Sequence, residues 1–350
     1  MEPRAEENIE GTKKRTDCAS VDDRVVIRPR PNNNVVIKAK IEDVPATGRS
    51  ETTARINLAI QNYFAANGRN EVVQPRLEDY QHTGRTDDID ARDAGEVLSV
   101  TPYVNDLYEY HRSKERDTSP SPSYMDKYTS INSSMREILI DWLVDVHWNF
   151  KMMKETLYLC VSVIDRFLER ETIDRNKLQL VGVTALLLAS KYEEIYTPSL
   201  SDLIHTCDGA YNDRDILTME VSILKTLKYN MTVPSAHIFL VRYLKAGHTS
   251  RRIAQYSSYI LDSTLQHYVL LKYLPSQLAA AAVMIARAKE KRHYWSPTLL
   301  KYTSYFKEDI IPVARTILIC IKGRGSHVDA VERKYTPARF GAVAGTEFHI

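Results

Sequence analysis

The fold is decided between residues 135 and 196, a stretch that opens MREILIDWLVDVHWNFKMMKETLYL (135–159) and closes LQLVGVTALLLASKYEEIY (178–196). Its apolar residues recur at helical spacing and predict three consecutive helices. Four charged side chains interrupt or border the apolar runs: Arg136, Asp165, Lys191 and Glu194. An unpaired charge inside a helical core is strongly unfavourable. Each of the four must therefore pair within its own domain or face a partner protein.

Composition sets the class of protein. The 350 residues suffice for two or three domains, and a net charge of +2 gives no global field for nucleic acid or an anionic membrane. The four cysteines lie far apart without metal-ligand spacing, which indicates reduced thiols rather than disulfides. No apolar segment follows Met1, and the longest apolar run, Leu278–Ala286, is too short to span a bilayer. We expect a soluble intracellular protein with no metal and no cofactor.

The first part of the chain differs from the rest. Residues 1–96 are polar and charged with short apolar islands, so we expect a disordered tail. Residues 97–130 contain an isolated amphipathic helix at Pro102–Arg112, followed by the extended segment TSPSPS (118–123). Ser119 and Ser121, each before a proline, are either phosphorylation sites or ordinary linker residues.

From residue 131 onward the pattern is helix after helix. Two units are expected, 131–232 and 233–325, followed by a C-terminal tail at 326–350. Each unit has a third helix that is rich in alanine and other small residues, which is typical of the buried centre of a bundle. The sequence predicts an all-α fold of two five-helix domains, with helices at Met135–Asn149, Glu155–Glu169, Asp174–Ile195, Ser199–Thr206 and Asn212–Leu227, then Ser235–Ala246, Ser250–Tyr268, Ser276–Lys291, Pro297–Tyr302 and Lys307–Ile321.

Several segments resemble a known family. MREILIDWLVDV, FKMMKETLYL, VIDRFLERE, LQLVGVTALLLASKYEEIYTPSLSDL and ILTMEVSILKTLKYNMTVPSA are similar to the cyclin box, most of all that of B-type mitotic cyclins. The resemblance runs from about Tyr103 to Thr336. It implies two tandem cyclin-box domains preceded by an N-terminal helix. It also implies a non-catalytic subunit that activates a cyclin-dependent protein kinase at the G2/M transition, in the nucleus and cytoplasm.

The resemblance divides the charged residues by role. Arg136 and Asp165 match the family's internal ion pair. Lys191 and Glu220 match the pair that binds the kinase backbone at its mobile regulatory helix, although both could be solvated residues at helix ends. Apolar kinase contacts are expected around them and on the N-terminal helix, where the same side chains could instead pack only on the cyclin core: Leu188, Tyr192, Leu224, Tyr229, Tyr103, Leu107 and Tyr110.

The resemblance also implies a second surface, which recruits substrates or inhibitors that carry Arg-x-Leu motifs. An added carboxylate, Glu137, replaces the family's alanine beside it and could alter peptide preference, and Arg175 borders it. A stripe at this spacing is normally core, and half of this one is expected to be. The docking residues would be Met135, Ile138, Leu139, Trp142 and Gln179, with Asp145 as the acid for the arginine.

Mitotic cyclins carry a destruction box that a ubiquitin ligase reads at mitotic exit. The candidate here is Arg55, Leu58 and Asn62, with the asparagine one residue early relative to the usual pattern.

Other functions fit less well. No glycine-rich phosphate loop, HExxH pair or GxSxG elbow is present, which argues against an enzyme. A cyclin-fold transcription factor would need a basic face, for which the balanced charge gives no support. A cyclin-like scaffold that does not activate a kinase also stays open, although Lys191 and Glu220 argue against it.

Overall fold

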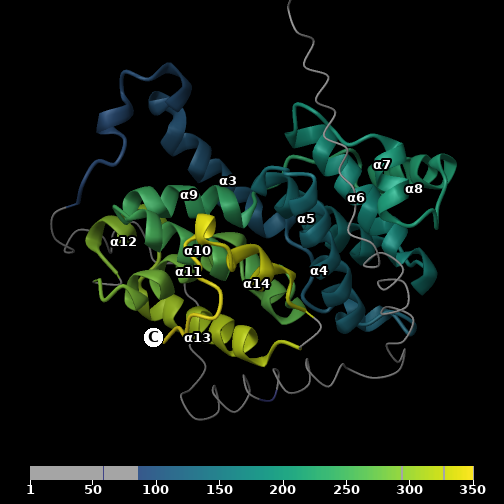
Figure 1. Cartoon of the computed structure of the whole chain (residues 1–350). Helices are drawn as coiled ribbons and strands as arrows, with labels where there is room; N and C mark the ends of the chain where they lie inside the picture. Colours follow the sequence, from purple (N-terminus) through teal and green to yellow (C-terminus); the bar gives the residue numbers. More distant parts are fainter. Residues whose placement is uncertain (1–57, 59–85, 293–294, 326–327, 350) are drawn as a thin grey trace, which may run out of the picture.

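The computed structural model describes residues 58, 86–292, 295–325 and 328–349, and these contain helices and no strand. The chain runs from an N-terminal helix through two sets of five helices to a short last helix (Figure 1). The all-α, two-unit prediction is therefore confirmed. The helices are α3 (Val104–Thr118), α4 (Ser133–Asn149), α5 (Lys154–Arg170), α6 (Leu178–Glu193), α7 (Leu200–Thr206), α8 (Asp213–Thr226), α9 (Ala236–Ala246), α10 (Arg251–Thr264), α11 (Pro275–Lys289), α12 (Pro297–Thr303), α13 (Lys307–Gly323) and α14 (Ala330–Tyr335).

The predicted bounds differ from the observed ones mainly where a short 3-10 helix stands apart from a longer helix. Residues Arg175–Lys177 form η6 ahead of α6, and Tyr268–Lys272 form η7 after α10. The N-terminal helix is longer than predicted and ends only at Thr118. Periodicity alone does not separate a 3-10 turn from the α-helix beside it, because both present residues three apart on one face.

Polar side chains cap the start of α4 and of α8. The side chain of Asn132 accepts a hydrogen bond from Met135 N at 3.1 Å and starts α4. Asn212 Oδ1 accepts one from Asp215 N at 3.1 Å, and Asn212 N donates in turn to Asp215 Oδ2, which completes a capping box at α8. Both caps satisfy N–H groups that a helix leaves unpaired at its first turn.

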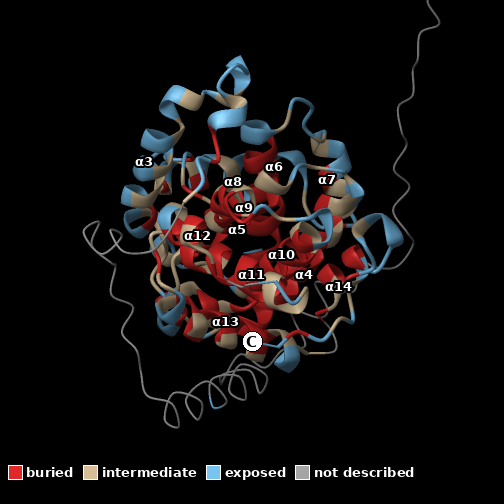
Figure 2. Ribbon diagram, turned by 90° about the vertical axis from the view of Figure 1, so that its left-hand side faces the viewer, coloured by how far each residue is buried: buried red, intermediate tan, exposed pale blue. Residues whose placement is uncertain are grey.

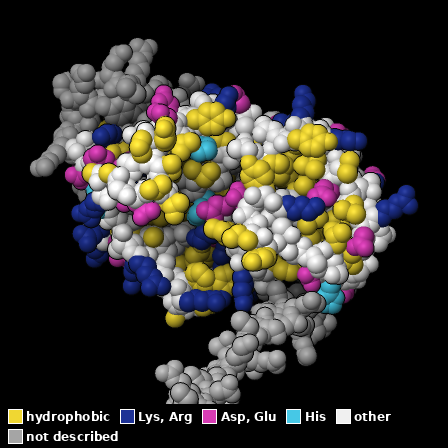
Figure 3. All heavy atoms as spheres, turned by 90° about the horizontal axis from the view of Figure 1, so that it is seen from above, with side chains coloured by type: hydrophobic (Ala, Val, Ile, Leu, Met, Phe, Trp, Pro, Cys, Tyr) yellow, Lys and Arg dark blue, Asp and Glu magenta, His cyan; other side chains and the backbone are white. Residues whose placement is uncertain are grey.

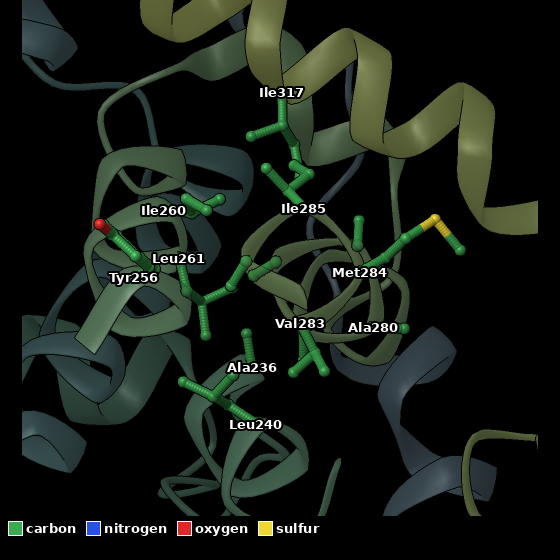
Figure 4. Packing of buried hydrophobic residues seen from close by; sticks show 14 of the residues in the cluster. Ala236, Leu240, Tyr256, Ile260, Leu261, Ala280, Val283, Met284, Ile285 and Ile317 are labelled. Atoms are coloured by element: carbon green, nitrogen blue, oxygen red, sulfur yellow. The ribbon is translucent and has the colours of Figure 1, made fainter. Parts of the chain in front are cut away.

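Each unit is built around one central helix. In the first unit, α6 is buried from Leu178 to Ser190 and packs against α4, α5 and α8. In the second, α11 is surrounded by α9, α10 and α13 (Figure 4), and its small residues Ala279 to Ala282 are fully buried. The buried residues fill the interior of both units (Figure 2). Small side chains let the surrounding helices approach closely, as the alanine-rich pattern predicts.

Buried polar contacts join the two units. Arg136 Nη1 on α4 donates to the carbonyl oxygens of Leu265 and Gln266, at 3.0 and 3.2 Å, in the second unit. The hydroxyl of Tyr158 on α5 donates to Asp262 Oδ1 on α10 at 2.7 Å. Because the donor side chains of Arg136 and Tyr158 are buried, breaking one of these bonds leaves a buried polar group without a partner.

The prediction of disorder up to residue 96 is wrong for residues 86–96. Ile89 is only 6% exposed, and Asp90 lies between Arg242 and Lys245 of α9. This segment is ordered by partners about 150 residues further along the chain. Its local composition is polar, so no local pattern could reveal that it folds.

The C-terminal residues, predicted only as a tail, fold back across both units. Tyr335 and Phe348 are buried, and α14 packs against α4 and α10. Lys334 Nζ binds Asp262 Oδ2 at 2.8 Å with both side chains buried. Burial favours the neutral carboxyl, but the charges of Lys334 and Lys154 outweigh it and hold the pKa of Asp262 well below its ordinary value.

Candidate functional site

The structure brings Lys191 and Glu220 together. Lys191 lies in the last turn of α6 and Glu220 in the middle of α8, and Lys191 Nζ is 2.6 Å from Glu220 Oε1. The lysine side chain is 46% exposed and the glutamate side chain 12%. An ion pair at the surface adds about 1 kcal/mol of stability or less. The fold therefore does not depend on this pair, which leaves both groups available to a partner.

Two exposed aromatic side chains belong to the same unit, one directly after Lys191 and one just after α8. Tyr192 is 50% exposed and Tyr229 is 66% exposed, so neither is a core aromatic. Tyr229 follows Lys228, and both have the left-handed conformation, with φ of 58° and 52°. Bulky residues rarely take this conformation, and such positions cluster at functional sites. Leu188 is only 5% exposed, so it belongs mainly to the core and supports the surface from below.

Further hydrophobic residues on this side of the first unit were missed by the sequence reasoning. Ile195 and Tyr196, just after α6, are each 91% exposed, and Val221 on α8 is 49% exposed. A groove of about 410 Å³ lies between residues 150–153 and residues 194–198. Figure 3 shows several hydrophobic patches on the face seen from above. The sequence signal for these exposed residues was the run EEIY (193–196), in which two apolar residues directly follow the charged end of a helix.

The N-terminal helix presents its predicted contact residues to solvent. Tyr103, Leu107 and Tyr110 are 64%, 45% and 54% exposed, so the alternative that they pack only on the cyclin core is wrong. The opposite face of α3 makes the internal contact, where the hydroxyl of Tyr108 donates to the Ile238 carbonyl at 3.2 Å. This bond attaches the helix to the second unit.

The predicted ion pair between Arg136 and Asp165 is confirmed. Arg136 Nε and Nη2 donate to the two carboxylate oxygens of Asp165 at 2.6 and 2.7 Å, and the side chains are 1% and 2% exposed. The hydroxyl of Tyr124 also donates to Asp165, at 2.7 Å. Burial opposes the charge of the guanidinium, but Asp165 outweighs this effect and raises the pKa of Arg136. The bidentate geometry compensates for much of the cost of removing both charges from water.

The predicted peptide-docking stripe on α4 lies mostly inside the fold. Met135 and Leu139 are 0% exposed, so the prediction that they contact a peptide is wrong. They belong to the core because α4 packs between α5, α6, α14 and η7. Ile138, Trp142 and Gln179 are 3–6% exposed. Trp142 Nε1 and both amide atoms of Gln179 have no hydrogen-bond partner among the described residues.

The charged residues beside this stripe are also engaged within the chain. Asp145 pairs with Arg333 of α14. Glu137 is 4% exposed, and its Oε1 lies 3.9 Å from His267 Nδ1 in the second unit. Desolvation raises the pKa of Glu137 to about 7 and lowers that of His267 to about 4. Glu137 therefore faces the neighbouring unit, and the expectation that it lies beside a peptide groove is wrong.

The remaining predictions concern residues that the structure covers only in part. Of the destruction-box candidate, Arg55 and Asn62 lie outside the described residues, whereas Leu58 is described and is 57% exposed. No cluster of three or more potential metal ligands occurs among the described residues. Within the same residues, no helix is both long and apolar enough to cross a membrane.

Two family models match the chain in tandem. The cyclin N-terminal domain matches residues 106–232, and the cyclin C-terminal domain matches residues 234–348. Among solved structures, a viral cyclin from herpesvirus saimiri aligns with a TM-score of 0.51 at 19% identity, over 55% of this chain and 87% of that one. At that identity the alignment supports the shared fold and nothing further.

Curated relatives share more of the sequence. Cyclin-B2-1 of Oryza sativa subsp. japonica is 43% identical over 262 residues, which are 74% of this chain and 62% of the rice protein. G2/mitotic-specific cyclin-2 of Medicago sativa is 41% identical over 262 residues, which are 80% of its own length. Cyclin-B2-3 of Arabidopsis thaliana is 40% identical, with 61% of its length covered. The two matched domains and these relatives show that the chain belongs to the cyclin family, with B-type cyclins among its relatives.

Proposed function

We propose that this cyclin binds and activates a cyclin-dependent kinase that acts in mitosis. The observation that carries the proposal is the Lys191–Glu220 pair, joined at 2.6 Å on an exposed face that also presents Tyr192 and Tyr229. The relatives' names, which include "G2/mitotic-specific cyclin", support the same role.

The chemistry of the pair suits a backbone partner. The ammonium group of Lys191 can donate to carbonyl oxygens, and the carboxylate of Glu220 can accept from N–H groups. Carbonyls are unpaired at the end of a helix and N–H groups at its start, so a helix terminus offers matching partners. The exposed aromatic rings around the pair would exclude water from these bonds.

Activation follows from differential binding. A protein kinase needs its strand lysine paired with a glutamate of its mobile helix before the ATP phosphates are positioned. A rigid surface that binds only the inward position of that helix shifts the kinase towards its active state. The cyclin contributes no catalytic group to the reaction.

The test is the double substitution Lys191→Ala with Glu220→Ala in the full chain. We expect loss of kinase binding in calorimetry and of histone phosphorylation, with unchanged helicity. The matched control is Lys307→Ala with Glu308→Ala, which removes another exposed lysine–glutamate pair, 3.6 Å apart on α13. Full activation by the first variant would refute the interface. If the unsubstituted protein binds the kinase but does not activate it, the protein is a scaffold and not an activator.

We also propose that Arg-x-Leu peptides dock beside Trp142 and Gln179, whose buried polar atoms lack partners among the described residues. Docking would require the side chains that cover Trp142 and Gln179 to move, and the peptide backbone would then pair with these atoms. Gln179→Ala should weaken binding of a fluorescent Arg-x-Leu peptide, whereas the exposed control Asn176→Ala should not. Equal affinities for both variants would contradict the proposal.

We further propose that the ubiquitin ligase of mitotic exit recognises residues 55–62 and marks the protein for destruction. We also propose that the protein resides in the nucleus and cytoplasm. The match of Arg55, Leu58 and Asn62 to the family motif supports the first.

A further inference from the structure

Arg242 on α9 is a buried arginine that contacts several elements of the fold, and no sequence motif pointed to it. It is 4% exposed, and its two terminal nitrogens donate to the two carboxylate oxygens of Asp90, each at 2.6 Å. Nη2 also donates to Asn105 Oδ1 on α3 at 2.9 Å. The guanidinium lies 5.0 Å from the ring centre of Tyr108 and 4.8 Å from that of Tyr302 on α12. One side chain therefore joins α9, α12, the first turns of α3 and the segment that precedes α3.

The segment before α3 closes over this arginine. Lys245 Nζ binds Asp90 Oδ1 and Asp93 Oδ2, both at 2.6 Å, and Ile89 N donates to the Tyr302 hydroxyl at 3.3 Å. Burial alone would raise the pKa of Asp90, but hydrogen bonds from Arg242 and Lys245 hold it below its ordinary value. The carboxylate is therefore ionised at neutral pH and bound on both sides. We call residues 86–93 the clamp.

The two ends of α3 are held in different ways. Near its C-terminal end, Glu115 accepts hydrogen bonds from Ser276 N and Oγ at 3.0 and 2.8 Å. In the middle, Arg112 donates to the Thr303 carbonyl at 2.5 Å. In the first turns, Asn105 accepts from Arg242 and Tyr108 donates to the Ile238 carbonyl, and both bonds are partly buried. In Figure 1 the segment rises beyond α9 and turns back into α3.

This arrangement decides where the outer face of α3 points. Tyr103 and Leu107 flank the turn that carries Asn105, and they are exposed because the inner face is bound to Arg242. If the clamp opens, Arg242 loses its carboxylate and the first turns of α3 lose their fixed orientation. The bound orientation would then be populated only part of the time.

We propose that the clamp positions the N-terminal helix for the kinase, with Asp90 and Arg242 as positioning residues that do not themselves contact it. The inference rests on the proposed function, because it assumes that Tyr103, Leu107 and Tyr110 face the kinase. It adds a requirement that lies outside both five-helix units: residues 86–93 must be present, and Asp90 must be paired with Arg242.

The first test is Asp90→Asn in the full chain, with Asp93→Asn as the matched control. Asp93 belongs to the same segment and pairs with Lys245, but it does not contact Arg242. If the docked orientation falls to a tenth of the population, the Kd for the kinase rises about tenfold. Activity at saturating cyclin stays at the wild-type level, because binding restores the orientation. Asp93→Asn should change the Kd by less than about twofold.

A second variant guards against a simple loss of folding. Arg242→Lys keeps the positive charge but loses the bidentate contact with Asp90, so it should raise the Kd in the same way as Asp90→Asn. Amide exchange of residues 104–108 should become faster in both variants, while exchange in α6 and α11 stays unchanged. Uniformly faster exchange in all helices would overturn the positioning role.

A double-mutant cycle separates positioning from structure. The substitution Leu107→Ala with Tyr110→Ala removes the contact face, so adding Asp90→Asn to it should cause no further loss of affinity. If Asp90→Asn weakens binding equally in both backgrounds, or weakens it in neither, the inference is overturned. If Leu107→Ala with Tyr110→Ala leaves the affinity unchanged, the assignment of α3 to the kinase fails, and the inference fails with it. The Lys191–Glu220 surface is tested separately and is not affected by that result.

Discussion

Replacing Asp165 by asparagine would leave a guanidinium buried without a counter-charge. Arg136 is 1% exposed and donates to both carboxylate oxygens of Asp165. Its remaining nitrogen is occupied by the carbonyls of Leu265 and Gln266 in the second unit. No described carboxylate other than Asp165 is hydrogen-bonded to this arginine. The substitution removes the charge and converts one acceptor into a donor that points at another donor.

The expected loss follows from measurements on comparable buried pairs. Removing one partner of a buried ion pair costs about 3–5 kcal/mol. Tyr124→Phe removes only the hydroxyl bond to the same carboxylate and should cost about 1 kcal/mol. Asp174→Asn, at an exposed carboxylate ahead of α6, should change the stability by less than about 0.5 kcal/mol. For a chain of this size, the loss in Asp165→Asn corresponds to a fall in melting temperature of roughly 5 °C.

The assay is urea unfolding followed by circular dichroism and by tryptophan fluorescence. The two probes must give the same transition before a midpoint is converted into a free energy. We expect the order Asp165→Asn, Tyr124→Phe, Asp174→Asn from the largest loss to the smallest. If Asp165→Asn costs no more than Tyr124→Phe, the pair does not stabilise the packing of α4 against α5 as its burial implies.

Two other predictions concern pH and turnover. Glu137 has a pKa of about 7 in the fold and an ordinary value of 4.5, so ionising it works against the folded state. Wild type should therefore lose up to about 3 kcal/mol relative to Glu137→Gln as the pH rises from 5 to 8, measured by urea unfolding at each pH. A difference between the two proteins that is the same at both pH values would contradict this. Arg55→Ala with Leu58→Ala should lengthen the half-life of the protein at mitotic exit in a cycloheximide chase, and equal half-lives would remove the destruction-box assignment.

The parts of the fold that the sequence predicted are those set by local patterns. The 3.6-residue periodicity located all five helices of each unit, and the small residues of 178–189 and 278–288 identified the two central helices. The caps Asn132 and Asn212 are local in the same way, because each side chain bonds a backbone N–H group three residues further along the chain. Such signals need no knowledge of distant parts of the chain.

The failures share one cause, which is dependence on a distant partner. Residues 86–96 look disordered until Arg242 and Lys245 are brought to Asp90. Glu137 looks like a surface carboxylate until His267 and the second unit cover it. Met135 and Leu139 were assigned to a docking surface by the family resemblance, but α4 is enclosed on several sides, and helical spacing alone cannot show how many sides of a helix are covered.

The kinase-facing surface proposed above is divided between the two units. Lys191 and Glu220 lie on the first unit, whereas α3 is fixed to the second through Arg242, Arg112 and Glu115. The affinity of a kinase that contacts both regions therefore depends on the relative placement of the units. That placement depends on buried contacts far from the surface, such as Arg136 with Leu265 and Tyr158 with Asp262. Tyr158→Phe, which removes one of these bonds, should therefore weaken kinase binding more than its small loss of stability explains. If binding falls only in proportion to the unfolded fraction, the two regions act independently and the kinase does not read the placement of the units.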